Sequence, residues 1–132
     1  KDIFSLAVLD INGLKKINDT YGHEAGDLFL RRFVQGMEIF LTKDDIFARY
    51  GGDEFAIIFI NKNRDQVNEM IKTIRSSFTD APLMYCGKEI AVISFEYGVT
   101  EFPADTSEYE ELVRLADTMM YKDKKKRKKP IR

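Results

Sequence analysis

Cysteine pairs and long apolar runs are missing from this chain of 132 residues. Its single cysteine, Cys86, excludes a disulfide within the chain and fits a reducing compartment. No apolar run approaches the roughly 20 residues of a membrane-spanning helix, and no signal-peptide pattern opens the sequence. We therefore expect no membrane contact by this chain.

The composition is that of a folded domain, with 44% hydrophobic and 33% charged residues. At this length we expect one domain over residues 1–132. The net charge of −1 hides an asymmetry, since residues 122–132 hold eight Lys or Arg and one Asp. Such a tail can bind nucleic acid, complete a phosphate site or be solvated. We expect no nucleic-acid partner, because the rest of the chain is acidic and no aromatic residues alternate with the lysines.

Apolar periodicity predicts alternating strands and helices. The expected elements are a strand over 3–9, a helical turn at 14–17, a loop at 18–22, a helix over 24–41, strands over 46–50 and 54–60, a helix capped by Asn63, a hairpin from 83–86 and 89–99, and a final helix from about 109. This order predicts an α+β, ferredoxin-like βαββαβ fold. It has an antiparallel-rich central sheet flanked by helices, with an added hairpin and a C-terminal helix.

Acidic residues stand at the ends of two predicted strands. Asp10 ends the first strand, and Asp53 and Glu54 follow Gly51-Gly52 at a tight turn. The first and third strands are neighbours in a ferredoxin-like sheet, so these acids can meet at one edge. Clustered carboxylates favour a cation between them, and hard oxygen ligands suit Mg²⁺ together with substrate phosphates. Acids and glycines are also common at ordinary turns, so the spacing alone leaves both interpretations open.

Other polar residues near the first strand fit two roles each. Amides at Gly13, where a helix begins, and the charge of Lys15 suit an anion, although a surface lysine explains Lys15 equally simply. Asn18 and Asp27 have the donors and acceptors to read a guanine edge, or serve as helix caps. His23, the single histidine, fits a structural role better than a catalytic one.

Four stretches of the sequence carry a more specific signal. They are Arg49–Phe55 (RYGGDEF), Asp10–Asp19, Gly22–Asp27 and Ala116–Lys124. They resemble, in order, the signature of the GGDEF domain family of diguanylate cyclases and its motifs D-x-D-x-F-K-x-I-N-D, G-H-x-x-G-D and A-D-x-A-L-Y-x-A-K. Together they span most of the chain. The resemblance implies a fold similar to the palm of nucleotide polymerases and adenylyl cyclases.

The resemblance also implies a role for each matching residue. Catalysis falls to Asp53 and Glu54. Mg²⁺ or Mn²⁺, with two ions expected per active site, is bound by Asp10, Asp53, Glu54 and the carbonyl of Ile11. The triphosphate is bound by the amides of Gly13 and Leu14 and by Lys15, Lys124 and Lys128. Guanine is read by Asn18 and Asp27, and Gly51 and Gly52 lie close to the nucleotide sugar.

The implied reaction joins two GTP molecules into cyclic di-GMP and two pyrophosphates across a homodimer, which can be transient. The alternative is a silent GGDEF-like module that binds GTP or a partner and regulates an adjacent domain. The family's leader segment D-x-L-T-G-L-x-N-R has no counterpart here, so we expect a piece of a longer bacterial signalling protein with a sensor or effector domain. The substrate and the lone thiol favour the cytoplasm, free or as the cytoplasmic part of a membrane-anchored protein.

Several positions depart from the family pattern, among them Leu14 in place of the usual Phe, where the role rests on the backbone amide. Asn12 replaces the second acid of D-x-D, at a position to which the resemblance gives no ligand role. Lys128 stands in place of Arg, which keeps the charge but loses the planar fork. The family's R-x-x-D inhibitory motif corresponds to Thr42–Asp45, where Thr42 lacks a guanidinium. We therefore expect a degenerate inhibitory site and weak or absent product inhibition.

Overall fold

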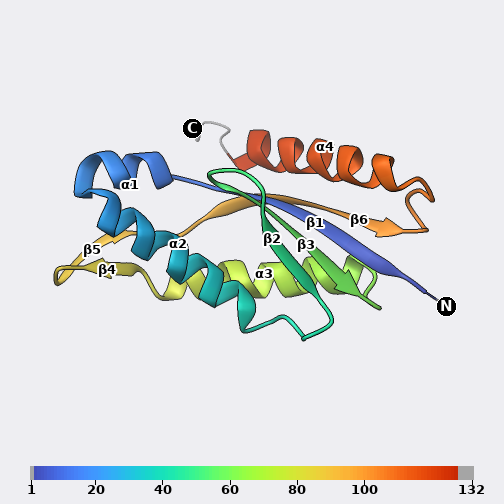
Figure 1. Cartoon of the computed structure of the whole chain (residues 1–132), viewed down its shortest axis with the longest axis horizontal. Helices are drawn as coiled ribbons and strands as arrows, with labels where there is room; N and C mark the ends of the chain where they lie inside the picture. The colour runs from blue at the N-terminus through green and yellow to red at the C-terminus, as the bar shows by residue number, and fades with distance from the viewer. Residues whose placement is uncertain (1, 128–132) are drawn as a thin grey trace.

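The computed structural model describes residues 2–127, apart from the side chain of Arg127. Its elements, in chain order, are β1 (Phe4–Ile11), α1 (Leu14–Tyr21), α2 (His23–Glu38), β2 (Ile46–Arg49), β3 (Glu54–Ile60), α3 (Arg64–Asp80), β4 (Leu83–Tyr85), β5 (Lys88–Ala91), β6 (Phe95–Phe102) and α4 (Tyr109–Arg127). Figure 1 shows α4 on one side of the sheet and α2 and α3 on the other. The predicted α+β class is confirmed.

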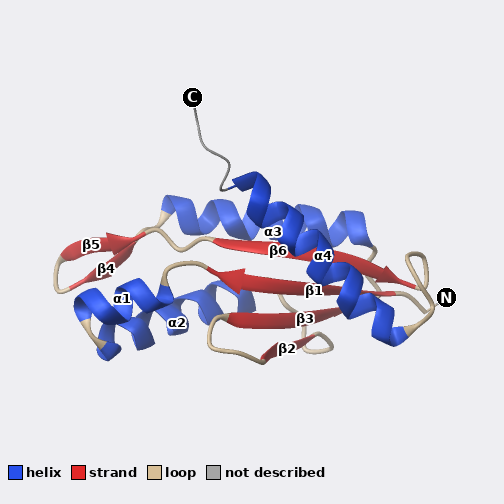
Figure 2. Cartoon of the chain, turned by 90° about the horizontal axis from the view of Figure 1, so that it is seen from above, coloured by secondary structure: helices blue, strands red, loops and turns tan. Residues whose placement is uncertain are grey.

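The main sheet is antiparallel and has the strand order β2-β3-β1-β6. β1 lies in its interior, where the run of apolar residues from Leu6 to Leu9 is buried on both faces. β3 alternates buried and half-buried residues, as expected for a strand with one face on the core. The predicted pairing of the first and third strands is thus confirmed, and it brings the ends of β1 and β3 together (Figure 2).

The core between the sheet and α2 and α3 is built around aromatic rings. Phe33 of α2 lies 4.9 Å from Phe55 of β3, and 5.8 Å from both Phe78 of α3 and Phe95 of β6, measured between ring centroids. All four side chains are buried. These contacts between offset and edge-on rings add to the free energy gained by burying apolar area, by about 1 kcal/mol each. They fix α2 and α3 against β6 and against β3, which begins at Glu54.

The predicted helix after Asn63 is confirmed. Asn63 and Gln66 form a reciprocal capping box, in which the Asn63 side chain accepts from the Gln66 N–H at 2.8 Å. The buried stripe of α3 consists of Val67, Ile71, Ile74 and Phe78. The predicted helix over 24–41 is shorter in the structure, where α2 ends at Glu38.

Two sequence predictions of secondary structure are wrong. Residues 18–21, expected as a loop, continue α1 to Tyr21, and the helix ends only at Gly22, whose φ of 98° is accessible to glycine. Residues 89–99, expected as one strand, form β5 and β6, separated at 92–94. β5 pairs with β4 in a small separate sheet, whereas β6 pairs with β1. The break between β5 and β6 is tied to the end of β1 by a 3.0 Å hydrogen bond from the Asn12 N–H to the Ser94 carbonyl. This contact competes with the continuation of a single strand.

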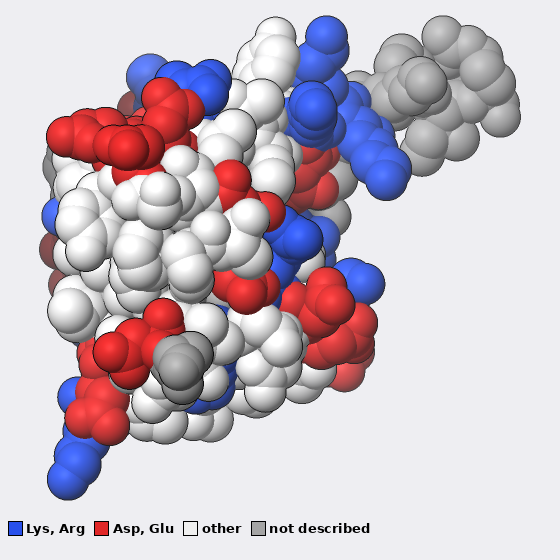
Figure 3. All heavy atoms as spheres, turned by 90° about the vertical axis from the view of Figure 1, so that its right-hand side faces the viewer, with Lys and Arg blue, Asp and Glu red and all other residues white. Residues whose placement is uncertain are grey.

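Within the part of the chain that the structure describes, no helix combines the length and the apolar character needed to cross a bilayer. Basic side chains gather near the end of α4, where Lys122, Lys125 and Lys126 are exposed (Figure 3).

Candidate active site

The predicted acidic residues lie together at one end of the main sheet. In the antiparallel register of β1 and β3, Asp10 stands opposite Glu54. The N–H of Ile11 donates a 2.9 Å hydrogen bond to the carbonyl of Asp53, in the turn before β3. The backbone of β1 and the backbone of the hairpin turn are therefore directly joined at these residues.

The β2–β3 hairpin that carries Asp53 is closed by its own contacts. The Tyr50 N–H donates to the Glu54 carbonyl at 3.0 Å. The Arg49 guanidinium donates to the carbonyl oxygens of Gly51, from Nε at 3.1 Å, and of Gly52, from Nη2 at 2.6 Å. A Cβ at Gly51 would lie 2.6 Å from Glu54 Oε1, whereas a Cβ at Gly52 would meet open space. Gly51 thus lets Glu54 fold against the turn, and Gly52 leaves space beside it.

Lys124 of α4 reaches into this acidic edge. Its Nζ lies 3.1 Å from Asp10 Oδ2, with 36% of the lysine side chain and 14% of the aspartate side chain exposed. The hydrogen bond that Lys124 donates to Asp10 raises the pKa of Lys124, and the charges of Asp10, Glu96 and Asp53 act in the same direction. A cationic group thus already lies among the carboxylates.

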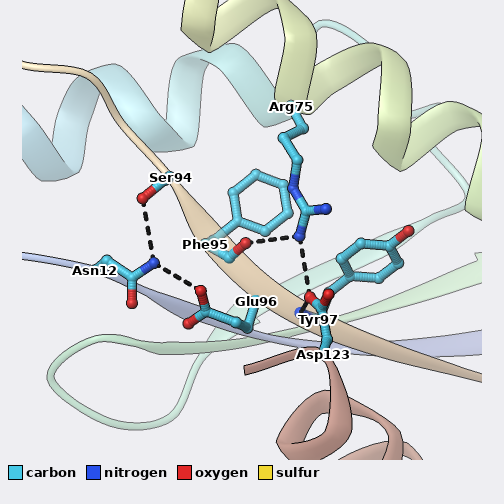
Figure 4. Close-up of polar contacts among 7 residues, drawn as sticks. All are labelled: Asn12, Arg75, Ser94, Phe95, Glu96, Tyr97 and Asp123. Atoms are coloured by element: carbon cyan, nitrogen blue, oxygen red, sulfur yellow. Dashed lines mark hydrogen bonds and ion pairs between the residues drawn. The ribbon is translucent and has the colours of Figure 1, made fainter. Parts of the chain in front are cut away.

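Sequence reasoning missed Glu96, which is 1% exposed and stands opposite Asp10 in the β1–β6 register. One of its oxygens accepts a 2.9 Å hydrogen bond from Nδ2 of Asn12, which also donates to Ser94 Oγ at 3.1 Å (Figure 4). Asn12 therefore links β1 to the start of β6. The available signal was a single acid, Glu96, among the largely apolar residues of the stretch 93–99.

Tyr50 reports the negative potential of the same edge. Partial burial raises the pKa of its hydroxyl, and the nearby carboxylates of Asp117, Glu54 and Asp10 raise it further. Asp117 comes from α4, so acids from three elements face this region. A site of this charge favours a bound cation.

The start of α1 offers free backbone donors. Gly13 adopts a left-handed conformation, with φ of 88°, and no side chain caps the helix there. The first N–H groups of α1 thus have no partner within their helix and can bind an anion. Lys15, on the first turn, pairs with Asp19 at 2.9 Å, which raises the pKa of the lysine.

A pocket of about 320 Å³ joins α1 to the hairpin. This volume lies within the range of about 300–1,000 Å³ typical of ligand pockets. Its lining consists of Leu14, Lys15, Asn18, Asp19, His23, Gly52 and Asp53. The structure thus brings residues predicted for phosphate, guanine and metal to one cavity, and adds Asp19 and His23.

The remaining predicted residues lie around this pocket or away from it. Asn18 packs closely on α2, since a Cβ at Gly26 would lie 1.7 Å from Asn18 Oδ1. Asp27, the next residue, is exposed on α2 and lies outside the pocket lining. Lys128 falls outside the described residues.

Asp45, predicted to belong to a degenerate inhibitory site, has a structural contact of its own. Its carboxylate accepts hydrogen bonds from the N–H of Thr42 at 2.9 Å and from the N–H of Ile60 at 3.0 Å. Asp45 thereby ties the turn before β2 to the end of β3. Weak product inhibition at this site stays a prediction.

The acidic edge fits a divalent ion that shares its coordination with a substrate. Over residues 2–127, no group of three or more His, Cys, Asp or Glu side chains is arranged to hold a metal ion. Mg²⁺, however, commonly uses one or two carboxylates and takes its other ligands from water and phosphate. Asp10, Asp53 and the Ile11 carbonyl are the groups able to provide that partial set, and the Lys124 ammonium shows that the edge accepts positive charge.

Comparison with known sequences gives consistent matches. A family model described as "Diguanylate cyclase, GGDEF domain" matches residues 1–130. "Diguanylate cyclase A" of Treponema denticola is 34% identical over 124 residues, which cover 94% of this chain and 33% of that protein. "Diguanylate cyclase DosC" of Escherichia coli K12 is 32% identical over 117 residues, covering 89% of this chain and 25% of that protein. The chain thus spans a quarter to a third of the length of these relatives.

Solved structures give the same result. The GGDEF domain of DgcB from Caulobacter crescentus, in complex with c-di-GMP, matches with a TM-score of 0.86 and 28% identity, covering 95% of this chain and 74% of that chain. The diguanylate cyclase SiaD from Pseudomonas aeruginosa, in complex with its activator SiaC, matches with a TM-score of 0.81 and 27% identity, covering 94% of this chain and 47% of that chain.

Proposed function

The chain belongs to the GGDEF domain family of diguanylate cyclases, and we propose that it condenses two GTP molecules into cyclic di-GMP and two pyrophosphates across a dimer of domains. The observation that carries this proposal is the hydrogen bond from the Ile11 N–H to the Asp53 carbonyl. This bond supports the meeting of Asp10 and Asp53 at one edge, beside a pocket that Asp53 itself lines.

Asp10 and Asp53, with the Ile11 carbonyl, would hold Mg²⁺ or Mn²⁺, and Glu54 completes the acidic edge. When bound, the ion supplies charge neutralisation at the phosphates and favours ionisation of the attacking 3′-hydroxyl. Asp53 and Glu54 lie at the hairpin end, where they would orient that hydroxyl. Gly52 leaves the open space that a nucleotide sugar requires.

The triphosphate would bind to the amides at the start of α1 and to two lysines. Lys15 and Lys124 each bond a carboxylate, Asp19 and Asp10 respectively. A triphosphate carries more negative charge than either carboxylate, so both lysines exchange partners when it binds. The departure of Lys124 also frees Asp10 to bind the cation. Binding of substrate and of metal is therefore coupled through one lysine.

Guanine would be read by Asn18 at the pocket and Asp27 beside it. Cyclic di-GMP has two-fold symmetry, and one site cannot present both of the ends that react, the 3′-oxygen and the α-phosphate. Each 3′-oxygen therefore attacks the α-phosphate bound to the partner domain, and pyrophosphate leaves. Positioning and charge stabilisation carry most of such a phosphoryl transfer.

Because the chain spans only part of its relatives' length, we also propose a sensor or effector domain in the parent protein, with the reaction in the cytoplasm.

The test is incubation with GTP and Mg²⁺ at several protein concentrations, with chromatography for cyclic di-GMP. Asp53→Ala is the test variant, and Asp80→Ala, an exposed acid at the end of α3, is the matched control. We expect product from the wild type and the control but not from Asp53→Ala, at a rate that rises with the square of protein concentration. Bound GTP without product at any concentration would instead indicate the silent module.

A further inference from the structure

Arg75 of α3 and Asp123 of α4 meet at the outer edge of β6 (Figure 4). Nη2 of Arg75 donates to the Phe95 carbonyl at 2.7 Å and to Asp123 Oδ2 at 3.0 Å. The same Asp123 oxygen accepts the N–H of Tyr97 at 3.0 Å. β6 is an edge strand, so these bonds occupy backbone groups that no neighbouring strand pairs. We call this set of contacts the edge clasp.

The edge clasp is more buried than a typical surface ion pair. Only 22% of the Arg75 side chain and 21% of the Asp123 side chain are exposed. The guanidinium carbon lies 5.2 Å from the ring centroid of Phe95 and 4.8 Å from that of Tyr97. Stacking on two rings and donating to two acceptors restrict Arg75 to one orientation. Asp123 of α4 is thereby held in a fixed position against β6.

Asp123 directly precedes Lys124, which contacts Asp10. α4 lies very close to β6 further back, because a Cβ at Gly98 would meet the Ala116 carbonyl oxygen at 2.0 Å and the Met120 nitrogen at 2.5 Å. Gly98 thus seats the middle of α4, and the edge clasp secures its last turns. With the contact at Gly98 and the edge clasp both in place, the backbone of Lys124 has a defined position above the acidic edge.

We propose that Arg75 and Asp123 are positioning residues that hold Lys124 in place to bind the GTP phosphates. This inference rests on the proposed function, in which Lys124 contacts phosphate. Neither residue has a role in the resemblance that identified the site. Their effect passes through Lys124, since both lie on the outer side of β6 in the contacts described above.

The direction in which Asp123→Ala changes the affinity for GTP separates positioning of Lys124 from simple electrostatics. Asp123 is a negative charge beside a lysine that binds a polyanion. If its charge alone mattered, removing it would strengthen GTP binding, because like charges repel. If the edge clasp positions Lys124, Asp123→Ala weakens GTP binding. Alanine favours helix, so α4 itself is expected to persist.

The experiment measures the dissociation constant of a non-hydrolysable GTP analogue with Mg²⁺ for Asp123→Ala, Lys124→Met and the double variant. Loss of one charge-assisted phosphate contact predicts about tenfold weaker binding for Lys124→Met. We expect a loss of roughly threefold to tenfold for Asp123→Ala and no further loss in the double variant. In turnover, Asp123→Ala raises KM for GTP more than it lowers kcat, whereas partial unfolding would lower kcat alone.

Two further variants complete the design. Arg75→Lys removes the contribution of α3 to the edge clasp, because an ammonium cannot stack and donate as the planar guanidinium does. We expect a loss of affinity for the GTP analogue similar to that of Asp123→Ala. Glu111→Gln, in an exposed pair with Arg114 on α4, is the control and leaves the affinity unchanged.

Unchanged or tighter binding in both Asp123→Ala and Arg75→Lys, with Lys124→Met still impaired, overturns the positioning role and leaves the proposed function standing. Losses that add in the double variant overturn it as well, because they show a route other than Lys124. Normal affinity in Lys124→Met overturns the phosphate role of that lysine, and the positioning role with it.

Discussion

Arg49 binds the carbonyl oxygen of Gly52 with two nitrogens, Nη2 at 2.6 Å and Nε at 3.2 Å. This contact holds the turn of the β2–β3 hairpin from the strand that precedes it. Since Asp53 follows Gly52 directly, the position of its carboxylate depends on this turn. Arg49 therefore acts on the candidate active site through the backbone.

Arg49→Met is expected to lower cyclase activity by about tenfold or more, because misplacement of a catalytic group is costly to rate. Arg49 is exposed, so we expect the thermal unfolding midpoint to change little. Arg49→Lys is the matched variant and should restore little activity, since an ammonium lacks the two donors of the planar fork. Full activity in Arg49→Met would contradict this role.

The two glycines of the hairpin are expected to respond differently to alanine. In Gly51→Ala the new methyl group would lie 2.6 Å from Glu54 Oε1, so Glu54 must move even without ligand. In Gly52→Ala the methyl group enters open space. Calorimetry should show weaker Mn²⁺ binding in the absence of nucleotide for Gly51→Ala only. Gly52→Ala should weaken binding of the GTP analogue while its metal affinity in the absence of nucleotide stays normal; the reverse pattern would refute the assignment.

Asp27 is expected to determine base preference. Asp27→Ser removes an acceptor for the guanine edge, so the preference for GTP over ATP should fall by roughly tenfold, the size of one good base contact. Competition binding with the two nucleotides measures this ratio. Asp19→Ser serves as the control, because Asp19 pairs with Lys15 in the structure. An unchanged ratio in Asp27→Ser would remove Asp27 from the guanine site.

Asp45 is expected to contribute to stability. Asp45→Ala leaves the N–H groups of Thr42 and Ile60 without their acceptor, which should lower the free energy of unfolding by about 2 kcal/mol. Denaturant unfolding monitored by circular dichroism measures the change. Asp44→Ala, at the exposed neighbouring position, is the control. Equal stability of the two variants would show that these bonds contribute little.

The sequence predicted the elements that depend on local pattern. The helix capped by Asn63 and the strand over 54–60 were found at their predicted places, because a cap or an apolar period acts within a few residues. The continuation of α1 through Asn18 was not predicted, since Asn, Asp and Thr are weak helix formers. There, packing against α2 at Gly26 and the late stop at Gly22 decide the structure.

Contacts across the sheet were beyond local reasoning. Glu96 meets Asn12 across 84 positions of the chain, and Arg75 meets Asp123 across 48. Only the register of β6 beside β1, and its place at the sheet edge, bring these groups together. The family motifs did identify Asp10, Asp53 and Lys124, which the structure places at one edge, although no motif indicates that Lys124 pairs with Asp10.

The central claim is that Asp10 and Asp53 jointly bind a divalent ion against a guanine nucleotide. The most direct measurement is a crystal structure with a non-hydrolysable GTP analogue and Mn²⁺, with the ion located by anomalous scattering. We expect a Mn²⁺ peak in contact with both carboxylates, and Lys124 moved from Asp10 to phosphate. A nucleotide bound in the pocket with Lys124 still on Asp10, and with Mn²⁺ elsewhere, would contradict the account.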